Sequence, residues 1–333
     1  MGRKRLYIGA AAISLLAVFA ACDNGTTSSS GKAGEFQKLV NDLNAKFGTS
    51  AGPVAELDKV NNKQINLIRP IVVNAAVASA GFTLTLPKDA VLKASGSNSI
   101  TVDGTKFTLE GEGGFYASEE DSLVASDNAA SEISVKTTLR LGHAGALKKG
   151  TAAPFAALDE KSALVTDAAL TGLPAALDPS AVVPYLVIAE NASLTTNAAI
   201  SAKTLELNGP INVSDAAHEL NITSALNLIK AAASITAVAQ DSIIKIAANG
   251  VITGIINSSS GNGSTLSITA SEWELSQGAA AFVEGTINGT VISQTTGLSS
   301  GSGTIKTGQE LELKAKNAGA VLKTDTVFAF DYQ

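Results

Sequence analysis

The stretch that decides the fold is TLELNGPINVSDAAHELNITSALNLI, residues 204–229. Short pairs of aliphatic residues alternate here with polar residues, and Asn, Gly, Ser and Asp separate one pair from the next. An alternation with a period of two predicts strands with one buried face, while the separating residues favour turns. The pairs are Leu205 and Leu207, Ile211 and Val213, Leu220 and Ile222, and Leu226 and Leu228.

The same texture continues on both sides of this stretch. Upstream, short alternating runs occupy residues 82–86, 100–102, 107–109 and 133–135, and downstream the aliphatic pairs recur as far as Ile305. Asp103-Gly104 separates two of the upstream runs and predicts a hairpin or a tight turn. We therefore expect a mainly β fold over most of the chain.

The small number of aromatic residues decides between the possible β architectures. Only 5% of the residues are aromatic, which is little material for the roughly 10 Å gap between the sheets of a β-sandwich. A parallel β-helix stacks small and aliphatic residues in narrow coils, and in its texture the chain resembles the β-solenoid bodies of bacterial surface proteins. We expect a right-handed parallel β-helix or solenoid-like body, with tandem β-sandwich modules as the alternative.

Composition and charge exclude one class of protein and disfavour another. The 333 residues are 45% hydrophobic and 16% charged, with a formal net charge of −6. A chain with this much apolar surface and so few charges is able to bury a core, which excludes an intrinsically disordered protein. The negative balance disfavours a polyanionic partner, so we expect no binding to nucleic acid.

The N-terminus has the layout of a secretory signal. Arg3, Lys4 and Arg5 precede the uncharged stretch 6–21, which ends in small residues directly before Cys22. As a helix this stretch would be about 24 Å long, shorter than the roughly 30 Å hydrocarbon core of a bilayer. Because Cys22 is the only cysteine in the chain, an intramolecular disulfide is excluded.

Phe19-Ala20-Ala21-Cys22 resembles the lipobox of bacterial lipoproteins, although Phe19 stands where that family usually has Leu. The resemblance implies cleavage of the signal peptide 1–21, a diacylglycerol thioether on Cys22 and palmitate among its acyl chains. It further implies a lipid-anchored protein on the periplasmic or surface side of the cell membrane or outer membrane. The alternative is an ordinary signal peptide that is cut nearby and leaves a free thiol.

The rest of the chain divides by composition. Residues 22–34 lack large apolar side chains and predict a flexible spacer, and residues 35–49 predict an amphipathic helix that docks on the body as a cap. A β-rich N-terminal part, 50–158, an Ala- and Pro-rich connection, 159–185, and a β-solenoid-like C-terminal part, 186–333, should follow. The apolar positions of the helix are Phe36, Leu39, Val40, Leu43 and Phe47.

Two sequence patterns suggest a catalytic serine, and neither has the expected context. Residues 297–301 match G-x-S-x-G, but strand texture follows them, and His143 and His218 both precede Ser299, whereas that hydrolase order places the histidine later. Ser242 and Lys245 match S-x-x-K, but residues three apart on a strand point to opposite faces. We therefore expect no catalytic residues in either pattern.

Three further groups of residues bear on metal or sugar chemistry. Glu272-Trp273-Glu274 places two carboxylates on one strand face. This arrangement suits calcium binding or acid–base chemistry on a sugar, but two solvated glutamates with Trp273 packed inward are the simpler interpretation. Glu119-Glu120-Asp121 indicates an acidic turn. Phe115-Tyr116 suits sugar stacking, but core or capping roles are favoured. One cysteine and two distant histidines do not match a familiar zinc site, so we expect neither a metal nor a cofactor.

These observations favour a structural, interaction or adhesion role without catalysis, with a protein or a polysaccharide as the partner. The alternative is a polysaccharide lyase or hydrolase on a β-helix scaffold. Residues 199–303 contain only Lys203, Lys230 and Lys245 as cations. An active site for an anionic sugar needs positive charge to stabilise developing negative charge, so this composition disfavours the enzyme.

Overall fold

The computed structural model describes residues 29–150, 155–177, 182–228, 230, 232–246, 251–253, 273–275, 284–287, 290–293, 303–305, 311–315 and 317–323. Cys22, Glu272 and Ser299, on which three sequence-based interpretations rest, lie outside these residues.

The described residues form one long helix, one short 3-10 helix and a series of mostly short strands. The helices are α1 (Ser29–Phe47) and η1 (Ala216–His218). The strands are β1 (Ala55–Leu57), β2 (Gln64–Leu67), β3 (Ile71–Asn74), β4 (Phe82–Leu86), β5 (Val91–Ala94), β6 (Ile100–Asp103), β7 (Lys106–Ala117), β8 (Leu123–Ala125), β9 (Glu132–Leu141), β10 (Leu147–Lys149), β11 (Phe155–Leu158), β12 (Ala163–Thr166), β13 (Ala169–Thr171), β14 (Val183–Ile188), β15 (Ser193–Thr195), β16 (Ile200–Leu207), β17 (Pro210–Val213), β18 (Leu220–Leu228), β19 (Ser234–Ala237), β20 (Ile243–Ile246), β21 (Val251–Thr253), β22 (Trp273–Leu275), β23 (Glu284–Ile287), β24 (Thr290–Ser293), β25 (Gly303–Ile305), β26 (Leu311–Ala315) and β27 (Val321–Lys323).

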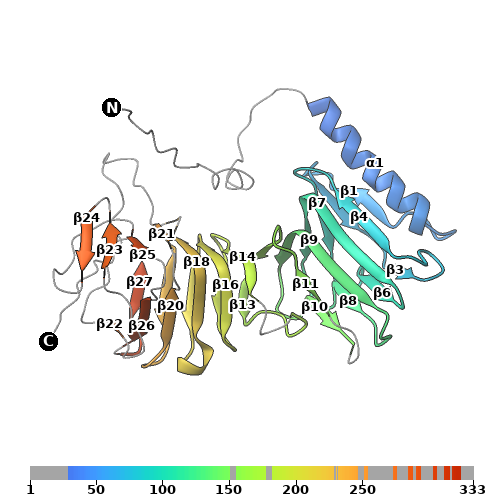
Figure 1. Ribbon diagram of the computed structural model, residues 1–333. Coiled ribbons are helices and arrows are strands. Elements are labelled where there is room, and N and C mark those ends of the chain that lie inside the picture. Colours follow the sequence, from blue (N-terminus) through green and yellow to red (C-terminus); the bar gives the residue numbers. More distant parts are fainter. Residues whose placement is uncertain are drawn as a thin grey trace, which may run out of the picture.

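The chain winds as a β-solenoid, in which the strands from β2 to β21 pair in parallel with the corresponding strands of neighbouring coils (Figure 1). One column of facing residues runs through the whole ladder, and its members are 19 residues apart at the closest, Leu186 to Leu205, and 27 at the widest, Ile65 to Leu92. This confirms the predicted solenoid and excludes tandem sandwiches. The column comprises Ile65, Leu92, Phe115, Leu139, Leu164, Leu186, Leu205, Leu226 and Ile252.

Further parallel sheets complete the wall of each coil. Strands β3, β6, β8 and β10 form one of them, and β13, β15, β17 and β19 form another farther along the chain. The inward side chains of successive coils lie on one another, as Ile71, Ile100 and Leu123 do, and together they form one continuous core. Because these residues are aliphatic, each coil stays narrow and the body is elongated (Figure 1).

Asp103-Gly104 forms a tight turn but not a hairpin. Strand β6, before the turn, pairs with β3 and β8, and strand β7, after it, pairs with β4, β5 and β9. The hairpin interpretation is therefore wrong, because the turn redirects the chain from one face of a coil to the next. Gly104 has a φ of 67°, a left-handed conformation that glycine adopts without steric cost.

Buried hydroxyl groups tie each coil to the one before it at the corners. The Oγ1 of Thr137 donates to the carbonyl of Gly113 at 2.6 Å, and the Oγ of Ser162 donates to the carbonyl of Val135 at 2.5 Å. A buried backbone carbonyl without a partner is costly, so the corners need small residues that carry a donor. This accounts for part of the Ser and Thr content of the chain.

Helix α1 covers the first coil of the solenoid (Figure 1). Phe36, Leu39, Val40 and Leu43 are buried and belong to the continuous core, which confirms the docked cap. Phe47 meets Phe82 edge to face, with ring centroids 5.3 Å apart. The helix begins at Ser29, within the segment that we expected to be a spacer.

Parallel pairing begins well before residue 186, where the solenoid-like part was expected to start. Strand β2 already pairs in parallel with β5, and within residues 159–185 strand β12 pairs with β9 on one side and β14 on the other. All four residues of β12 are buried, so its sequence shows no alternation of apolar and polar positions. This is why residues 159–185 resembled an irregular connection.

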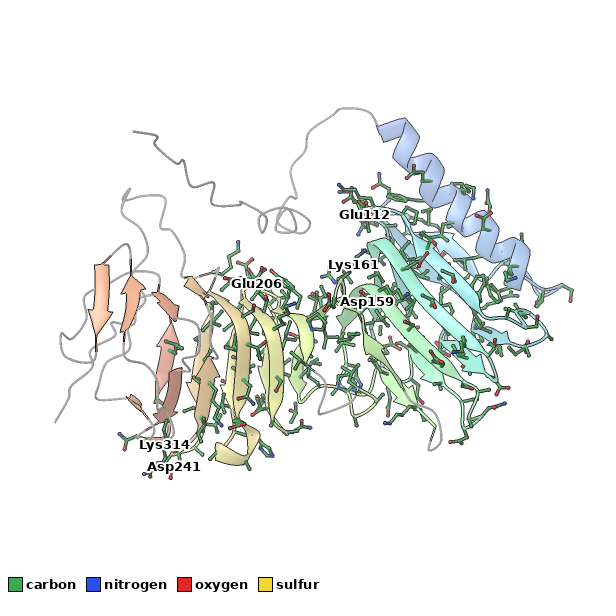
Figure 2. All side chains as sticks on the ribbon, viewed as in Figure 1. Glu112, Asp159, Lys161, Glu206, Asp241 and Lys314 are labelled. Carbon is green, nitrogen blue, oxygen red and sulfur yellow. The ribbon has the colours of Figure 1, made fainter. Side chains whose placement is uncertain are left out.

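The last strands close the far end by reversing direction. Strand β26 pairs antiparallel with β20, and β27 pairs antiparallel with β19. The Nζ of Lys314 on β26 lies 2.8 Å from the Oδ1 of Asp241, in the corner that precedes β20 (Figure 2). Beside β20 and beside β19, an antiparallel strand thus takes the place that a parallel strand of a further coil would occupy.

The Asn44 side chain joins the cap to β1, and its loss should destabilise the cap. Its Oδ1 accepts hydrogen bonds from the backbone N–H groups of Val54 and Ala55, and its Nδ2 donates to the carbonyl of Ala55, all within 2.9 Å. Val54 and Ala55 are buried, so Asn44→Ala leaves their donors unsatisfied. We expect the free energy of unfolding to fall by about 2 kcal/mol in urea denaturation followed by circular dichroism.

Asn41→Ala is the matched control for this prediction. It makes the same change in helix propensity, but Asn41 is exposed and bonds only to the exposed Gln37 among the contacts that the structure gives it. Equal effects of the two substitutions would contradict the role of Asn44 in holding the cap.

Candidate functional site

The outer side of the long ladder carries an aligned set of side chains, most of them polar or aromatic. Residues that point outward between the buried ones stack in register from coil to coil, just as the buried residues do. We call this surface the ladder face. From the N-terminal end it comprises Asn66, Lys93, Tyr116, Arg140, Val165, Val187, Glu206 and Asn227.

Tyr116 stands between two cations, one from each neighbouring coil. The Nζ of Lys93 lies 5.7 Å from the centroid of its ring, and the Cζ of Arg140 lies 5.9 Å from it. Both distances are those of cation–π contacts. Burial and the charge of Asp167 raise the pKa of Tyr116, and Arg140 opposes this rise. With a cation from each side at its ring, Tyr116 is ill placed to stack on a sugar.

Arg140 also holds a carboxylate on the following coil. Its Nη2 donates to both oxygens of Asp167, at 2.7 Å and 2.8 Å. Both side chains are largely buried, with exposed fractions of 22% and 21%. Charge-assisted hydrogen bonds in such surroundings are stronger than the usual surface ion pair. Arg140 therefore contacts Asp167 through charge-assisted hydrogen bonds and Tyr116 through the face of its aromatic ring.

A second linked group is centred on Glu206, farther along the ladder face. The hydroxyl of Tyr185 donates to the Oε2 of Glu206 on the next coil at 2.5 Å, and the Nδ2 of Asn208 donates to Oε1 at 3.1 Å. Burial, followed by the hydrogen bond and the charge of Glu206, raises the pKa of Tyr185 strongly. Figure 2 shows Glu206 along the upper side of the C-terminal half of the body.

The polar groups on the ladder face and directly beside it therefore hold one another. Lys93, Arg140, Tyr185 and Glu206 each contact a side chain of an adjacent coil. Between the two groups, Val165 is buried although its position in the ladder is outward. These contacts order the outward side chains, and they engage the carboxylates of Asp167 and Glu206 in hydrogen bonds within the protein.

Ser214, Asp215 and His218 form a cluster that the sequence patterns did not reveal. The Nδ1 of His218 lies 2.7 Å from the Oγ of Ser214 and 3.2 Å from the Oδ2 of Asp215. In a catalytic triad the serine and the carboxylate contact different ring nitrogens, whereas here both contact the same one. Asp215 also accepts hydrogen bonds from the backbone N–H groups of Ala217 and His218 and so caps η1. The cluster stabilises a corner and is not a nucleophile with its base.

Ser242 and Lys245 do not form a catalytic pair. Ser242 is fully buried, and its Oγ donates to the carbonyls of Ala239 and Val213. The Nζ of Lys245 lies 2.9 Å from the Oε2 of Glu219. Burial opposes the ionisation of Glu219, but hydrogen bonds from Lys245 and Asn221 outweigh it and lower the pKa of this carboxyl.

The remaining candidates occupy separate places. Phe115 is fully buried in the central column, as the core interpretation required. Asp121 of the acidic turn is paired with Lys148 at 2.8 Å. Glu274 lies on β22 opposite Lys314 of β26 in the strand register. Throughout the described part of the chain, no three His, Cys, Asp or Glu side chains come together as metal ligands would.

The fold alone indicates the class of this protein, because the comparisons with known proteins found no match. No protein-family model, no curated protein and no solved structure matches this chain. Within the residues that the structure describes, no helix has the length and apolar character needed to cross a membrane. By its fold the protein is a β-solenoid with a helical cap.

The contact between Tyr185 and Glu206 predicts a loss of stability in alkali. In the unfolded chain a tyrosine ionises at about pH 10, while the pKa of Tyr185 in the fold is raised. Its contribution is therefore complete below pH 10 and is lost as the pH rises above that value. The urea midpoint of the wild type should fall more steeply between pH 9 and 11 than that of Tyr185→Phe.

Glu206→Gln provides the control for the origin of this effect. It keeps the phenol but removes the carboxylate that opposes its ionisation, so its midpoint should fall less steeply with pH than that of the wild type. Identical slopes for all three proteins would show that the contact does not shift the titration of Tyr185.

Proposed function

We propose that this protein is a bacterial envelope lipoprotein, anchored through Cys22, whose solenoid is an interaction surface without catalytic activity. The observation that carries the proposal is the order of features at the N-terminus. Three cations, an uncharged stretch and two small residues directly precede the only cysteine of the chain. Two or three acyl chains on that residue anchor a protein far more firmly than a single chain does.

The geometry of the body supports an interaction role. The ladder face is aligned over successive coils and is held by contacts among its own side chains, such as Arg140 with Asp167 and Tyr185 with Glu206. A partner therefore meets side chains that are already ordered, and less conformational entropy is lost on binding. A protein or a polysaccharide that extends along several coils is the kind of partner that fits such a surface.

The alternative function is a polysaccharide lyase or hydrolase, and the site chemistry disfavours it. Ser242 donates to corner carbonyls, Lys245 is paired with Glu219, and Tyr116 is flanked by cations. Groups committed in this way are poorly placed to exchange protons with a substrate. A glycan array combined with a reducing-sugar release assay separates the two functions. Turnover that is lost in Glu272→Gln would establish the enzyme.

Radiolabelled palmitate provides the direct test of the anchor. Expressed in a bacterium that processes lipoproteins, the wild type should incorporate the label, and Cys22→Ala should not, because it lacks the thiol that receives diacylglycerol. The wild type should also enter the detergent phase on Triton X-114 partitioning. Equal labelling of both proteins, or a mature product that begins at another residue, would disprove the anchor.

A further inference from the structure

The turn between β1 and β2 displays an apolar side chain at the N-terminal end of the solenoid. Val60, in this turn, has an exposed fraction of 98%, the highest of the exposed large hydrophobic residues in the described chain. Strand β1 pairs only with β2, antiparallel to it, and so forms the edge of the ladder beyond the first coil. We call residues 58–63 the end loop.

Hydrogen bonds hold the end loop in one conformation. The Oδ1 of Asp58 accepts from the backbone N–H groups of Val60 and Asn61, at 2.9 Å and 2.8 Å, and its Oδ2 accepts from the Nδ2 of Asn66. The backbone N–H of Gln64 donates to the carbonyl of Asn61. These bonds to Asp58 lower the pKa of its carboxyl to about 2. Val60 is thus held outward by an ordered loop.

The charges around Val60 are complementary to an anionic surface. Lys59 and Lys63 flank it in the end loop and are exposed. The one carboxylate of the loop, Asp58, accepts three hydrogen bonds from the loop and from Asn66. An exposed aliphatic side chain between two lysines suits the boundary between headgroups and acyl chains, where the lysines contact anionic headgroups.

The end loop and helix α1, which follows the proposed anchor in the sequence, lie at the same end of the solenoid. Helix α1 packs on β1 and covers this end, opposite the end where β23 and β24 lie (Figure 1). Residues 23–28 separate Cys22 from the start of α1, and the seven Cα–Cα steps from Cys22 to Ser29 span at most about 25 Å. A bilayer that holds Cys22 is therefore close to the capped end of the solenoid.

We propose that the end loop docks on the anionic headgroup surface of the membrane that holds Cys22, with Val60 inserted and Lys59 and Lys63 in contact with lipid phosphates. This inference rests on the proposed lipid anchor. One aliphatic side chain and two lysines bind a membrane weakly on their own. The anchor makes their binding intramolecular and raises the effective concentration of the surface, so docking sets the orientation of the solenoid.

The test uses the full-length lipidated protein in vesicles of phosphatidylethanolamine and phosphatidylglycerol. Because Cys22 is acylated, Val60→Cys introduces a single reactive thiol for the environment-sensitive dye NBD. We expect a blue shift and a stronger emission on vesicles than in detergent micelles. Val238→Cys is the matched control, since Val238 is also an exposed valine, with an exposed fraction of 50%, and lies after β19 toward the other end. Its emission should not shift.

Charge neutralisation tests the role of the lysines. With the dye at position 60, Lys59→Gln and Lys63→Gln should each weaken docking about fivefold, the effect expected for the loss of one cation near an anionic surface. Added salt should have the same effect, because it screens this attraction.

Each other outcome has a distinct meaning. If the protein floats with the vesicles but the dye at position 60 does not shift, the docking inference is wrong and the anchor stands. If positions 60 and 238 shift equally, adsorption is non-specific and the inference is also wrong. If the wild type fails to float with the vesicles, the anchor itself is disproved, and the docking inference with it.

Discussion

The whole body depends on one steric constraint, which is that every inward side chain must lie on the inward side chain of the next coil. Parallel strands are about 4.8 Å apart, so each side chain in the column of facing residues lies directly on its neighbours and has to fit the same narrow cross-section. Phe115 fits between Leu92 and Leu139 because these neighbours are themselves large. Elsewhere in the interior, Ala94 faces Ala117, and Ala117 in turn faces Leu141, so small residues occupy positions where the cross-section is limited. The aliphatic and alanine-rich composition follows from this constraint.

The same register that stacks the core also determines the chemistry of the outside. Outward residues of successive coils are forced into contact, and their charges and rings are complementary, as with Lys93, Tyr116 and Arg140. At the corners, hydroxyls such as those of Thr137 and Ser162 satisfy carbonyls of the preceding coil. Polar residues in this protein therefore connect coils, and this explains why motifs that suggest catalysis, such as Ser242 with Lys245, are structural in the fold.

The sequence predicts the general fold well because alternation and composition report directly on burial. Residues 204–228 cover the end of β16, strands β17 and β18 and the connections between them, with the predicted inward positions at Leu205, Ile211 and Ile222. Alternation does not predict where the solenoid begins, because β12 is buried on both faces and its sequence does not alternate between apolar and polar residues. The ladder face is not readable either. Its members are 19 to 27 residues apart, so coil lengths vary, and Tyr116 meets Arg140 only through the register.

The capped end has a consequence for assembly. A parallel ladder exposes unpaired backbone groups at its terminus and is a template for another chain. Here the terminal strand β1 runs antiparallel to β2, and its hydrogen-bond spacing does not match that of a parallel coil. Helix α1 lies against the same strand and occupies the space that an added coil would need. The β1 edge of the long ladder is therefore a poor template for end-to-end growth into fibrils.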